Sequence, residues 1–233
     1  MTVVNDLRQL YLRCRTEGIP VDPHVAYIAI QSVGDYSTIR SDYLANLENT
    51  IVAVLEEEKS LSAGRSTIKQ AMATAFVDAF ETGWIETGGD PYEPEADDSE
   101  WLATRIDQEL ANIDGMFSTM KGMMNDTEEP LTSDEIAQYA QARAQGYTVT
   151  LDGVYGQGKM RGKKSVMLTL DGPDGNESCR TCQQYKGKRH RARWWISHDL
   201  VPAPGNDMYE CGGWQCQHVL VDDKGVQWAG AQE

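Results

Sequence analysis

The sequence predicts an α+β protein in which a mainly helical N-terminal region precedes a small, cysteine-rich α+β domain. Two observations carry this prediction. Apolar residues recur at three- and four-residue steps through residues 1–146, which is the spacing of amphipathic helices. After Gly146, short apolar runs alternate with glycines, and four of the five cysteines lie there. We therefore divide the chain into a helical region, 1–146, and an α+β domain, 147–233.

The first part of the helical region contains three apolar stripes. The clearest runs over residues 36–59, and a second follows over 62–84. Residues 3–14 show the same spacing, so we expect a further helix there with Cys14 as a buried core thiol.

An acidic link near residues 88–98, rich in glycine and proline, interrupts the helical pattern. Asp98 or Ser99 can cap the helix that follows it. Thr132 and Glu135 have the spacing of a capping box, which predicts the start of another helix. We expect that last helix to end at the glycine that closes the helical region.

Short strands and turns are expected from residue 147 onward. Val149, Leu151 and the run 166–170 supply apolar residues for strands. The glycines between them are typical of turns, and they are Gly153, Gly156, Gly158, Gly162, Gly172 and Gly175. Their spacing does not match a phosphate-binding loop, because the lysine and hydroxyl residue that such a loop needs are not at the required positions.

Two close-spaced cysteine pairs face each other across a 28-residue segment. Cys179 and Cys182 form a C-x2-C pair, and Cys211, Cys216 and His218 form a C-x4-C-x-H group. Two such pairs can place four thiolates around one tetrahedral zinc ion, with His218 as a reserve ligand. The alternative is that the cysteines are reduced or disulfide-paired without a metal. A chain without a signal peptide is expected in the reducing cytosol, which favours the metal.

The charge of the chain is strongly uneven. The formal net charge is −15, yet residues 159–193 hold ten lysines and arginines against three acidic residues. Such asymmetry indicates a separate partner for the basic stretch, either nucleic acid or an acidic protein, unless the stretch is only a solvated surface. The candidate contact residues are Lys186, Lys188, Arg189, Arg191 and Arg193. No segment is long and apolar enough to suggest a membrane span.

The cysteine region resembles a known family. The run 176–188, N-E-S-C-R-T-C-Q-Q-Y-K-G-K, resembles the E-S-C-x-x-C-x-x-(L/Y)-x-G-K signature of the phage minor head proteins, a head morphogenesis family similar to the F protein of phage Mu. The run 209–218, Y-E-C-G-G-W-Q-C-Q-H, resembles the closing motif of the same family, C-G-G-(W/Y/F)-x-C-R-H, with Gln217 in place of the arginine.

The resemblance implies a structural, non-enzymatic protein of the virion head, present in several copies near the portal and made in the host cytoplasm. Its expected partners are portal and capsid or scaffold proteins, with packaged DNA as a further partner and no membrane. The residues agree with a non-enzymatic role, because no H-x-E or C-x-E element of a zinc deaminase precedes Cys179. The alternative is a zinc-ribbon module that binds nucleic acid through residues 189–193, with Trp194 and Trp195 stacking on bases.

Overall fold

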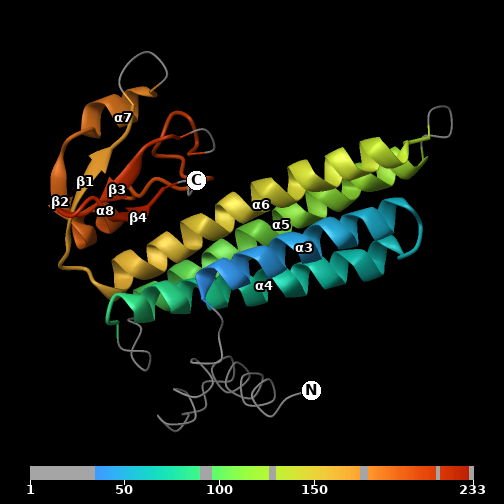
Figure 1. The fold of residues 1–233 in the computed structure, drawn as a ribbon, viewed down its shortest axis with the longest axis horizontal. Helices are drawn as coiled ribbons and strands as arrows, with labels where there is room; N and C mark the ends of the chain where they lie inside the picture. Colours follow the sequence, from blue (N-terminus) through green and yellow to red (C-terminus); the bar gives the residue numbers. More distant parts are fainter. Residues whose placement is uncertain (1–34, 90–95, 126–129, 174–177, 214–215, 231–233) are drawn as a thin grey trace, which may run out of the picture.

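The structure is a computed structural model, and the residues that it describes are 35–89, 96–125, 130–173, 178–213 and 216–230. They form a long helical bundle with a small sheet domain beside one end of it (Figure 1). The predicted order, a mainly helical region followed by a part that contains strands, is confirmed. The N-terminal apolar stretch and Cys14 lie outside the described residues.

Four helices form the bundle: α3 (Tyr36–Leu55), α4 (Leu61–Glu86), α5 (Ala96–Asn125) and α6 (Ser133–Gly162). The apolar stripes of the sequence form its core. Its largest fully buried members include Leu47, Ile51, Ile68, Met72, Phe76, Ile113 and Met120. Full burial of one such side chain stabilises a protein by about 1.5–3 kcal/mol, so this core is the main source of the bundle's stability.

Three of the helices begin at a side chain that accepts a hydrogen bond from the first helical turn. Asp35 accepts one from the backbone N–H of Thr38 at 2.9 Å, and Ser60 caps α4 in the same way. The capping box predicted for Thr132 and Glu135 is present at the start of α6. These caps satisfy N–H groups that have no partner within the helix.

The end of α6 differs from the prediction. The sequence predicts a helix end at Gly146 with strands after it, but α6 continues through Val149 and Leu151 to Gly162. The first strand in the described residues begins only at Met167. The prediction was wrong because four glycines of this stretch lie at close contacts and not in turns: Gly158 and Gly162 face α4, and Gly153 and Gly156 face the sheet domain.

The backbones of α4 and α6 approach each other very closely. A Cβ atom on Gly158 would lie 2.2 Å from the carbonyl oxygen of Phe80, and one on Gly83 would lie 2.4 Å from the carbonyl oxygen of Tyr155. Real Cβ atoms essentially never make contacts under 3.0 Å. Both positions therefore require glycine, and the two helices pack here through their main chains.

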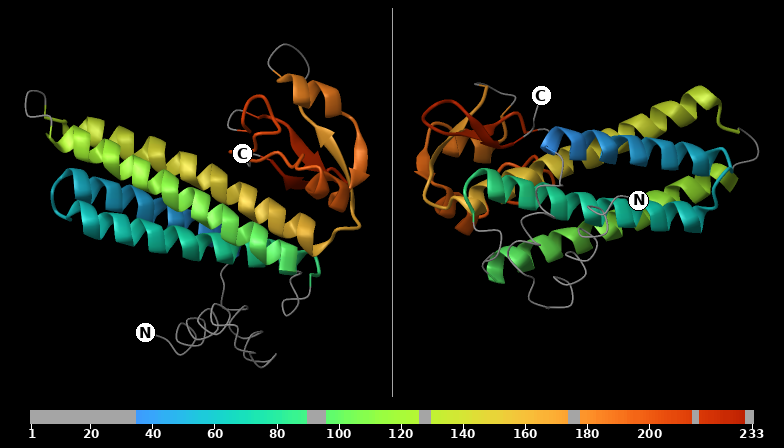
Figure 2. Two further views of the ribbon diagram at one scale, coloured as in Figure 1. Left: turned by 180° about the vertical axis from the view of Figure 1, so that it is seen from behind. Right: turned by 60° about the horizontal axis from the view of Figure 1, so that its bottom comes forward.

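The sheet has the strand order β2-β1-β3-β4, and all neighbouring strands are antiparallel. Its strands are β1 (Met167–Asp171), β2 (Arg189–Arg191), β3 (Val219–Val221) and β4 (Gln227–Ala229). Two short helices accompany them, α7 (Arg180–Tyr185) and α8 (Ala192–Ser197). The whole unit lies beside the C-terminal half of α6 (Figure 2).

Helix α6 belongs to both parts of the molecule. Its residue Met160 is fully buried in the core of the sheet domain, where it joins Leu168, Trp195 and Leu220. The Lys159 ammonium group of α6 also donates a hydrogen bond of 2.7 Å to a backbone carbonyl of β4. The bundle and the sheet domain therefore both pack against the C-terminal half of one continuous helix.

Asp98 does not cap α5, which begins at Ala96, but forms a buried ion cluster. Its carboxylate is 0% exposed, and it accepts hydrogen bonds from Arg161 Nη1 at 2.6 Å and from Lys164 Nζ at 3.0 Å. The guanidinium group of Arg161 also lies 4.9 Å from the centroid of the Trp101 ring. The cluster joins the start of α5 to the end of α6.

Replacing Gly158 by Ala is expected to lower the free energy of unfolding by about 2 kcal/mol or more, because the new methyl group forces α4 and α6 apart. Gly146→Ala in the same helix is the matched control, since a Cβ atom there meets nothing within 4 Å. That change should raise the free energy of unfolding by about 0.5–1 kcal/mol. Urea denaturation followed by circular dichroism measures both, and equal stability of the two variants would contradict the close contact.

Replacing Asp98 by Ala is expected to destabilise the protein by about 3–5 kcal/mol, because the change leaves a buried guanidinium group without its counter-charge. Asp114 provides the control. It forms ion pairs with Arg65 and Lys69, but its side chain is 41% exposed. Thermal denaturation of Asp114→Ala should give a far smaller change, because exposed ion pairs contribute little. A similarly small change in both variants would argue against a stabilising role for the buried cluster.

Candidate metal centre

The candidate ligands come from three segments of the sheet domain. Cys179 is the residue that precedes α7, and Cys182 lies within that helix. Cys211 lies in a stretch of turns, and His218 directly precedes β3, two residues after Cys216. All four of these cysteines are free thiols. The pairs that are far apart in the sequence meet because α7 packs against the chain that leads into β3.

Three of the candidate ligands form a compact buried group. The sulfur atoms of Cys182 and Cys216 lie 3.4 Å apart, and the ligand atoms of Cys182, Cys216 and His218 all lie within 4.8 Å of one another. The three residues are 1%, 8% and 2% exposed. Two thiolates on one tetrahedral zinc ion lie ~3.8 Å apart, given zinc–sulfur bonds of ~2.3 Å. The group could therefore hold a metal ion.

Cys179 and Cys211 surround this group on its outer side. Both are partly exposed and pack against the buried cluster of Cys182, Tyr209 and Cys216. The phenol of Tyr209 is held in place by a hydrogen bond of 2.9 Å that it donates to a backbone carbonyl. All four cysteines thus belong to one cluster, with two thiols inside it and two at its edge.

Backbone contacts fix the turn that carries Cys211. The Glu210 carboxylate accepts a hydrogen bond of 2.9 Å from the N–H of Arg180, which joins the turn to the start of α7. Gly213 has a φ of +75°, and a Cβ atom there would lie 1.8 Å from the carbonyl oxygen of Ala203. A residue with a side chain does not fit at this position, which explains a glycine between the two cysteines.

The thiols of the cluster differ in how readily they lose a proton. Burial raises the pKa of Cys182, and the hydrogen bond and charge of Cys216 and then of Cys179 raise it further. Burial also raises the pKa of Cys211. Burial acts in the same direction on Cys179, but hydrogen bonds from Cys182 and Cys211 outweigh it, so the pKa of Cys179 lies below its usual value. A metal ion that binds these thiols must displace their protons, so its affinity should rise with pH.

The sequence predicted the convergence of the two pairs but ranked the ligands differently. It made His218 a reserve ligand, whereas the structure places it in the closest group with Cys182 and Cys216. The His218 imidazole lies directly against Gly172, since a Cβ atom on that glycine would lie 2.6 Å from the imidazole Cδ2 atom. This contact comes from the end of β1, and no spacing within the cysteine motifs could have indicated it.

The predicted basic contact residues do not all have the same surroundings. All four of Lys188, Arg189, Arg191 and Arg193 are exposed, but among the described residues only Arg189 of these four forms an ion pair, at 2.5 Å with Asp223. Trp195 is 0% exposed, so it cannot stack on a base as the nucleic-acid alternative required. All five predicted residues lie between the end of α7 and the first turn of α8: Lys186, Lys188, Arg189, Arg191 and Arg193.

A cleft of about 400 Å³ separates α5 and α6 from the loop 199–207 of the sheet domain. Two guanidinium groups line it, but each has a carboxylate partner. Arg105 pairs with Glu109 at 2.8 Å, and Arg161 belongs to the buried ion cluster. Arg105 also donates a hydrogen bond of 2.9 Å to the carbonyl oxygen of Pro204. Arg105 thereby joins the bundle to the sheet domain.

The chain matches no protein-family model, and no curated protein or solved structure matches it. The resemblance to phage minor head proteins therefore rests on the two cysteine motifs alone. Within the described residues, no helix has both the length and the apolar character needed to cross a membrane.

Replacing Cys182 by Ser, or His218 by Gln, is expected to weaken cobalt(II) binding about tenfold or more, because each change removes one of the three closest ligand atoms. A cobalt titration followed through the thiolate-to-cobalt absorption band measures this affinity. Cys14→Ser, which also removes one thiol, should bind cobalt as the wild-type protein does. Unchanged affinity in the Cys182 and His218 variants would rule out this group as the metal site.

Proposed function

We propose that the protein is a non-enzymatic component of a phage head that acts in capsid assembly near the portal. The observation that supports the proposal is the convergence of the two motifs. The family-like runs 176–188 and 209–218 are separate in the sequence, yet their cysteines form one cluster with a buried centre. A shared structural site explains why the two motifs occur together in one chain.

We further propose that the cluster binds one structural zinc ion, with Cys182, Cys216 and His218 as three ligands and Cys179 or Cys211 as the fourth. Four protein ligands fill a tetrahedral site and leave no position for a substrate, so a site of this kind stabilises and does not catalyse. Between α8 and β3 the described residues form turns and loops without a helix or strand. A cross-link through a metal would hold this stretch in place where regular hydrogen bonding does not.

The helical bundle is the proposed contact surface for the portal and for capsid or scaffold proteins. Helices α5 and α6 are each 30 residues long and carry many exposed polar side chains along their outer faces. A groove of about 480 Å³ lies between them, lined by residues that include Gly115, Arg143 and Tyr147. A long rigid body with its own core suits a protein that bridges larger subunits.

Elemental analysis of protein purified without chelator should give close to one zinc ion per chain. Removing the metal with a strong chelator should loosen the sheet domain and leave most of the helical signal in circular dichroism, because the bundle has a separate core. Four freely titrating thiols and no metal in the purified protein would contradict the zinc site and leave the fold unchanged.

Coexpression with portal, scaffold and capsid proteins of one phage tests the assembly role. The wild-type protein should sediment with assembled heads, and the double change of Cys179 and Cys182 to Ser should reduce its incorporation about fivefold or more, because loss of the site unfolds the sheet domain. Cys14→Ser is the control and should be incorporated normally. Heads that assemble, fill and infect equally well without the protein would refute a required assembly role.

A further inference from the structure

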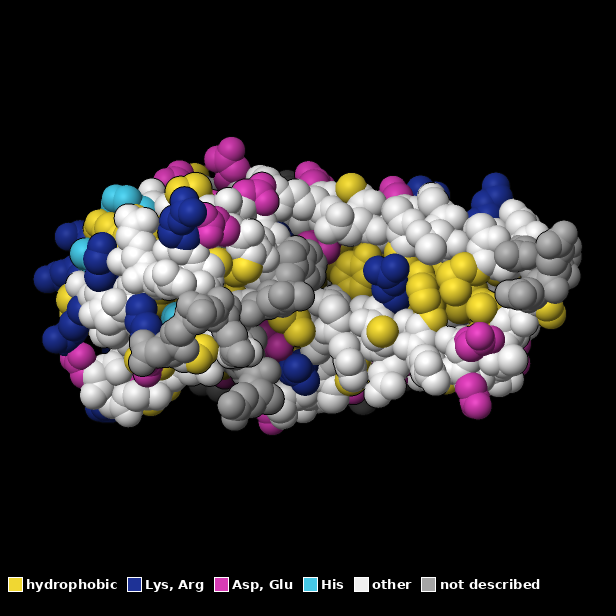
Figure 3. Space-filling model, turned by 90° about the horizontal axis from the view of Figure 1, so that it is seen from above, with side chains coloured by type: hydrophobic (Ala, Val, Ile, Leu, Met, Phe, Trp, Pro, Cys, Tyr) yellow, Lys and Arg dark blue, Asp and Glu magenta, His cyan; other side chains and the backbone are white. Residues whose placement is uncertain are grey.

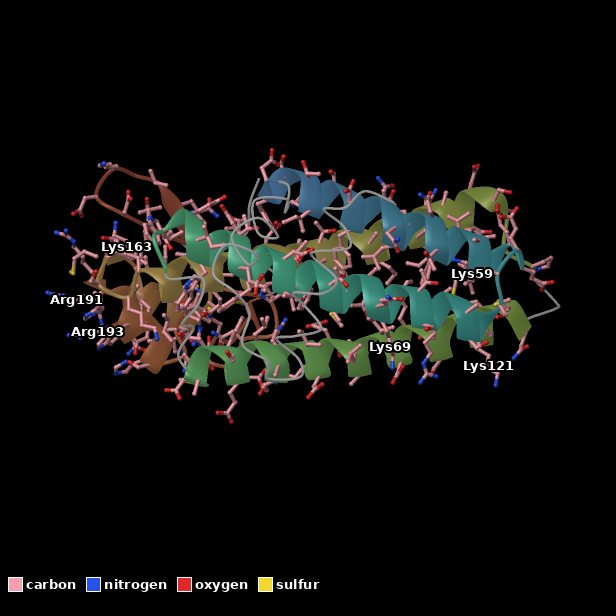
Figure 4. The ribbon with its side chains drawn as sticks, turned by 90° about the horizontal axis from the view of Figure 1, so that it is seen from below. Lys59, Lys69, Lys121, Lys163, Arg191 and Arg193 are labelled. Atoms are coloured by element: carbon pink, nitrogen blue, oxygen red, sulfur yellow. The ribbon has the colours of Figure 1, made fainter. Side chains whose placement is uncertain are left out.

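Four cations gather at one end of the molecule, and we call them the basic end: Lys163, Lys188, Arg191 and Arg193. Lys163 directly follows α6, Lys188 directly precedes β2, and the two arginines lie where β2 passes into α8. Figure 4 shows Lys163, Arg191 and Arg193 together at the end of the molecule that carries the sheet domain. Figure 3, from the opposite side, also shows lysine and arginine side chains gathered at that end.

Backbone hydrogen bonds bring these residues together from separate parts of the sequence. The N–H of Ala192 donates to the carbonyl oxygen of Val166 at 2.8 Å, and the N–H of Arg193 donates to that of Lys164 at 3.0 Å. The start of α8 is therefore joined to the segment that follows α6. This joint places Lys163 beside the arginines, a proximity that the sequence alone does not indicate.

The charge of the basic end is not neutralised within the part of the chain that the structure describes. No carboxylate there forms an ion pair with any of its four cations. Neighbouring cations differ in this respect, since Arg189 pairs with Asp223 and Lys164 with the buried Asp98. Four positive charges without a carboxylate partner among the described residues, on a protein of net charge −15, indicate a surface that attracts a polyanion locally.

The two tryptophans of α8, next to the basic end, are not open for stacking. The ring of Trp194 is stacked with His190 at 3.7 Å and with His198 at 4.1 Å between centroids. Two rings at these distances cannot share one face, so each histidine covers one face of the indole. Trp195 is fully buried, and its Nε1–H donates to the carbonyl oxygen of Leu168 at 3.2 Å. Bases of a single strand therefore find no platform on these two tryptophans.

The basic end also lacks the apolar centre of a protein–protein interface. Among the described residues, the large hydrophobic side chains that are exposed are Met208 and Val226, and neither lies in β2, α8 or the segment after α6. Stable protein interfaces bury an apolar centre within a polar rim. A contact made at this end must therefore depend on charge.

We propose that the basic end binds the phosphate backbone of double-stranded nucleic acid and does not read its bases. Duplex DNA carries one negative charge per about 1.7 Å of its axis, which suits a cluster of point charges better than a flexible single strand does. The acidic bundle is repelled by the same phosphates, so the molecule approaches the duplex with its sheet domain first. The inference rests on the charge distribution and is independent of the role in head assembly.

Fluorescence anisotropy with a labelled 30-base-pair duplex of arbitrary sequence tests the proposal. The wild-type protein should bind at low salt, with a slope of about −3.6 in a plot of log affinity against log salt concentration, as four phosphate contacts require. The triple change of Lys163, Arg191 and Arg193 to Glu should weaken binding about tenfold or more at 50 mM salt and reduce the slope to about −1.

The matched control reverses three cations elsewhere on the helical bundle, with Lys59, Lys121 and Arg143 changed to Glu. Figure 4 shows Lys59 and Lys121 at the end of the bundle that lies away from the basic end. Both triple variants have the same net charge, so the control should lose less than about threefold in affinity if position matters. Equal losses in the two variants would overturn the proposal.

Two further measurements distinguish duplex DNA from single-stranded DNA and from acidic proteins as the partner. A 30-nucleotide oligothymidine should bind more weakly than the duplex, and tighter binding of the single strand would contradict a backbone site without stacking. Polyglutamate should compete poorly at equal concentration of negative charge. Competition as strong as that of the duplex, lost in the same variant, would instead identify a docking surface for acidic proteins. The triple variant of Lys163, Arg191 and Arg193 should lose DNA binding and still be incorporated into heads normally. This outcome would show that DNA binding and the proposed assembly role are separate.

Discussion

The contact between the backbones of α4 and α6 is the constraint on which the rest of the structure depends. Gly83 and Gly158 let the two helices meet without side chains between them. This contact fixes the rotation of α6 about its axis, and that rotation decides which residues enter each core. It turns Ala144 and Leu151 toward the bundle and Met160 toward the sheet domain. A bulkier residue at either glycine would displace both cores together.

The sequence predicted the elements whose signals are local. Apolar stripes located the helices, and Thr132 with Glu135 located a helix start, because a capping box depends only on residues that are close in the chain. The glycines of α6 were misread because a glycine in a turn and a glycine at a helix contact look the same in one sequence. Asp98 was misread for a similar reason. An acidic residue near a helix start is typical of a cap, and its partner Arg161 lies far along the chain.

The candidate metal centre was predictable in part. Paired cysteines with short spacings predict convergence, and the thiols do converge. The inner position of Cys182, Cys216 and His218 depends on the packing of α7 and β1 around them, which spacing does not encode. The basic stretch shows the same limit. Composition identified the cations, but only the fold separates Arg189, which has a carboxylate partner, from Arg191, which has none within the described residues.

Helix α6 also fixes a distance within the molecule. At a rise of about 1.5 Å per residue, its 30 residues span about 45 Å without a break. Because the same helix is built into both cores, the distance between the far end of the bundle and the cysteine cluster cannot vary as it would across a flexible linker. A partner bound at each end of the molecule would be held at a fixed separation and orientation. Two larger bodies bound in this way would have a defined spacing, which a flexible tether would not give them.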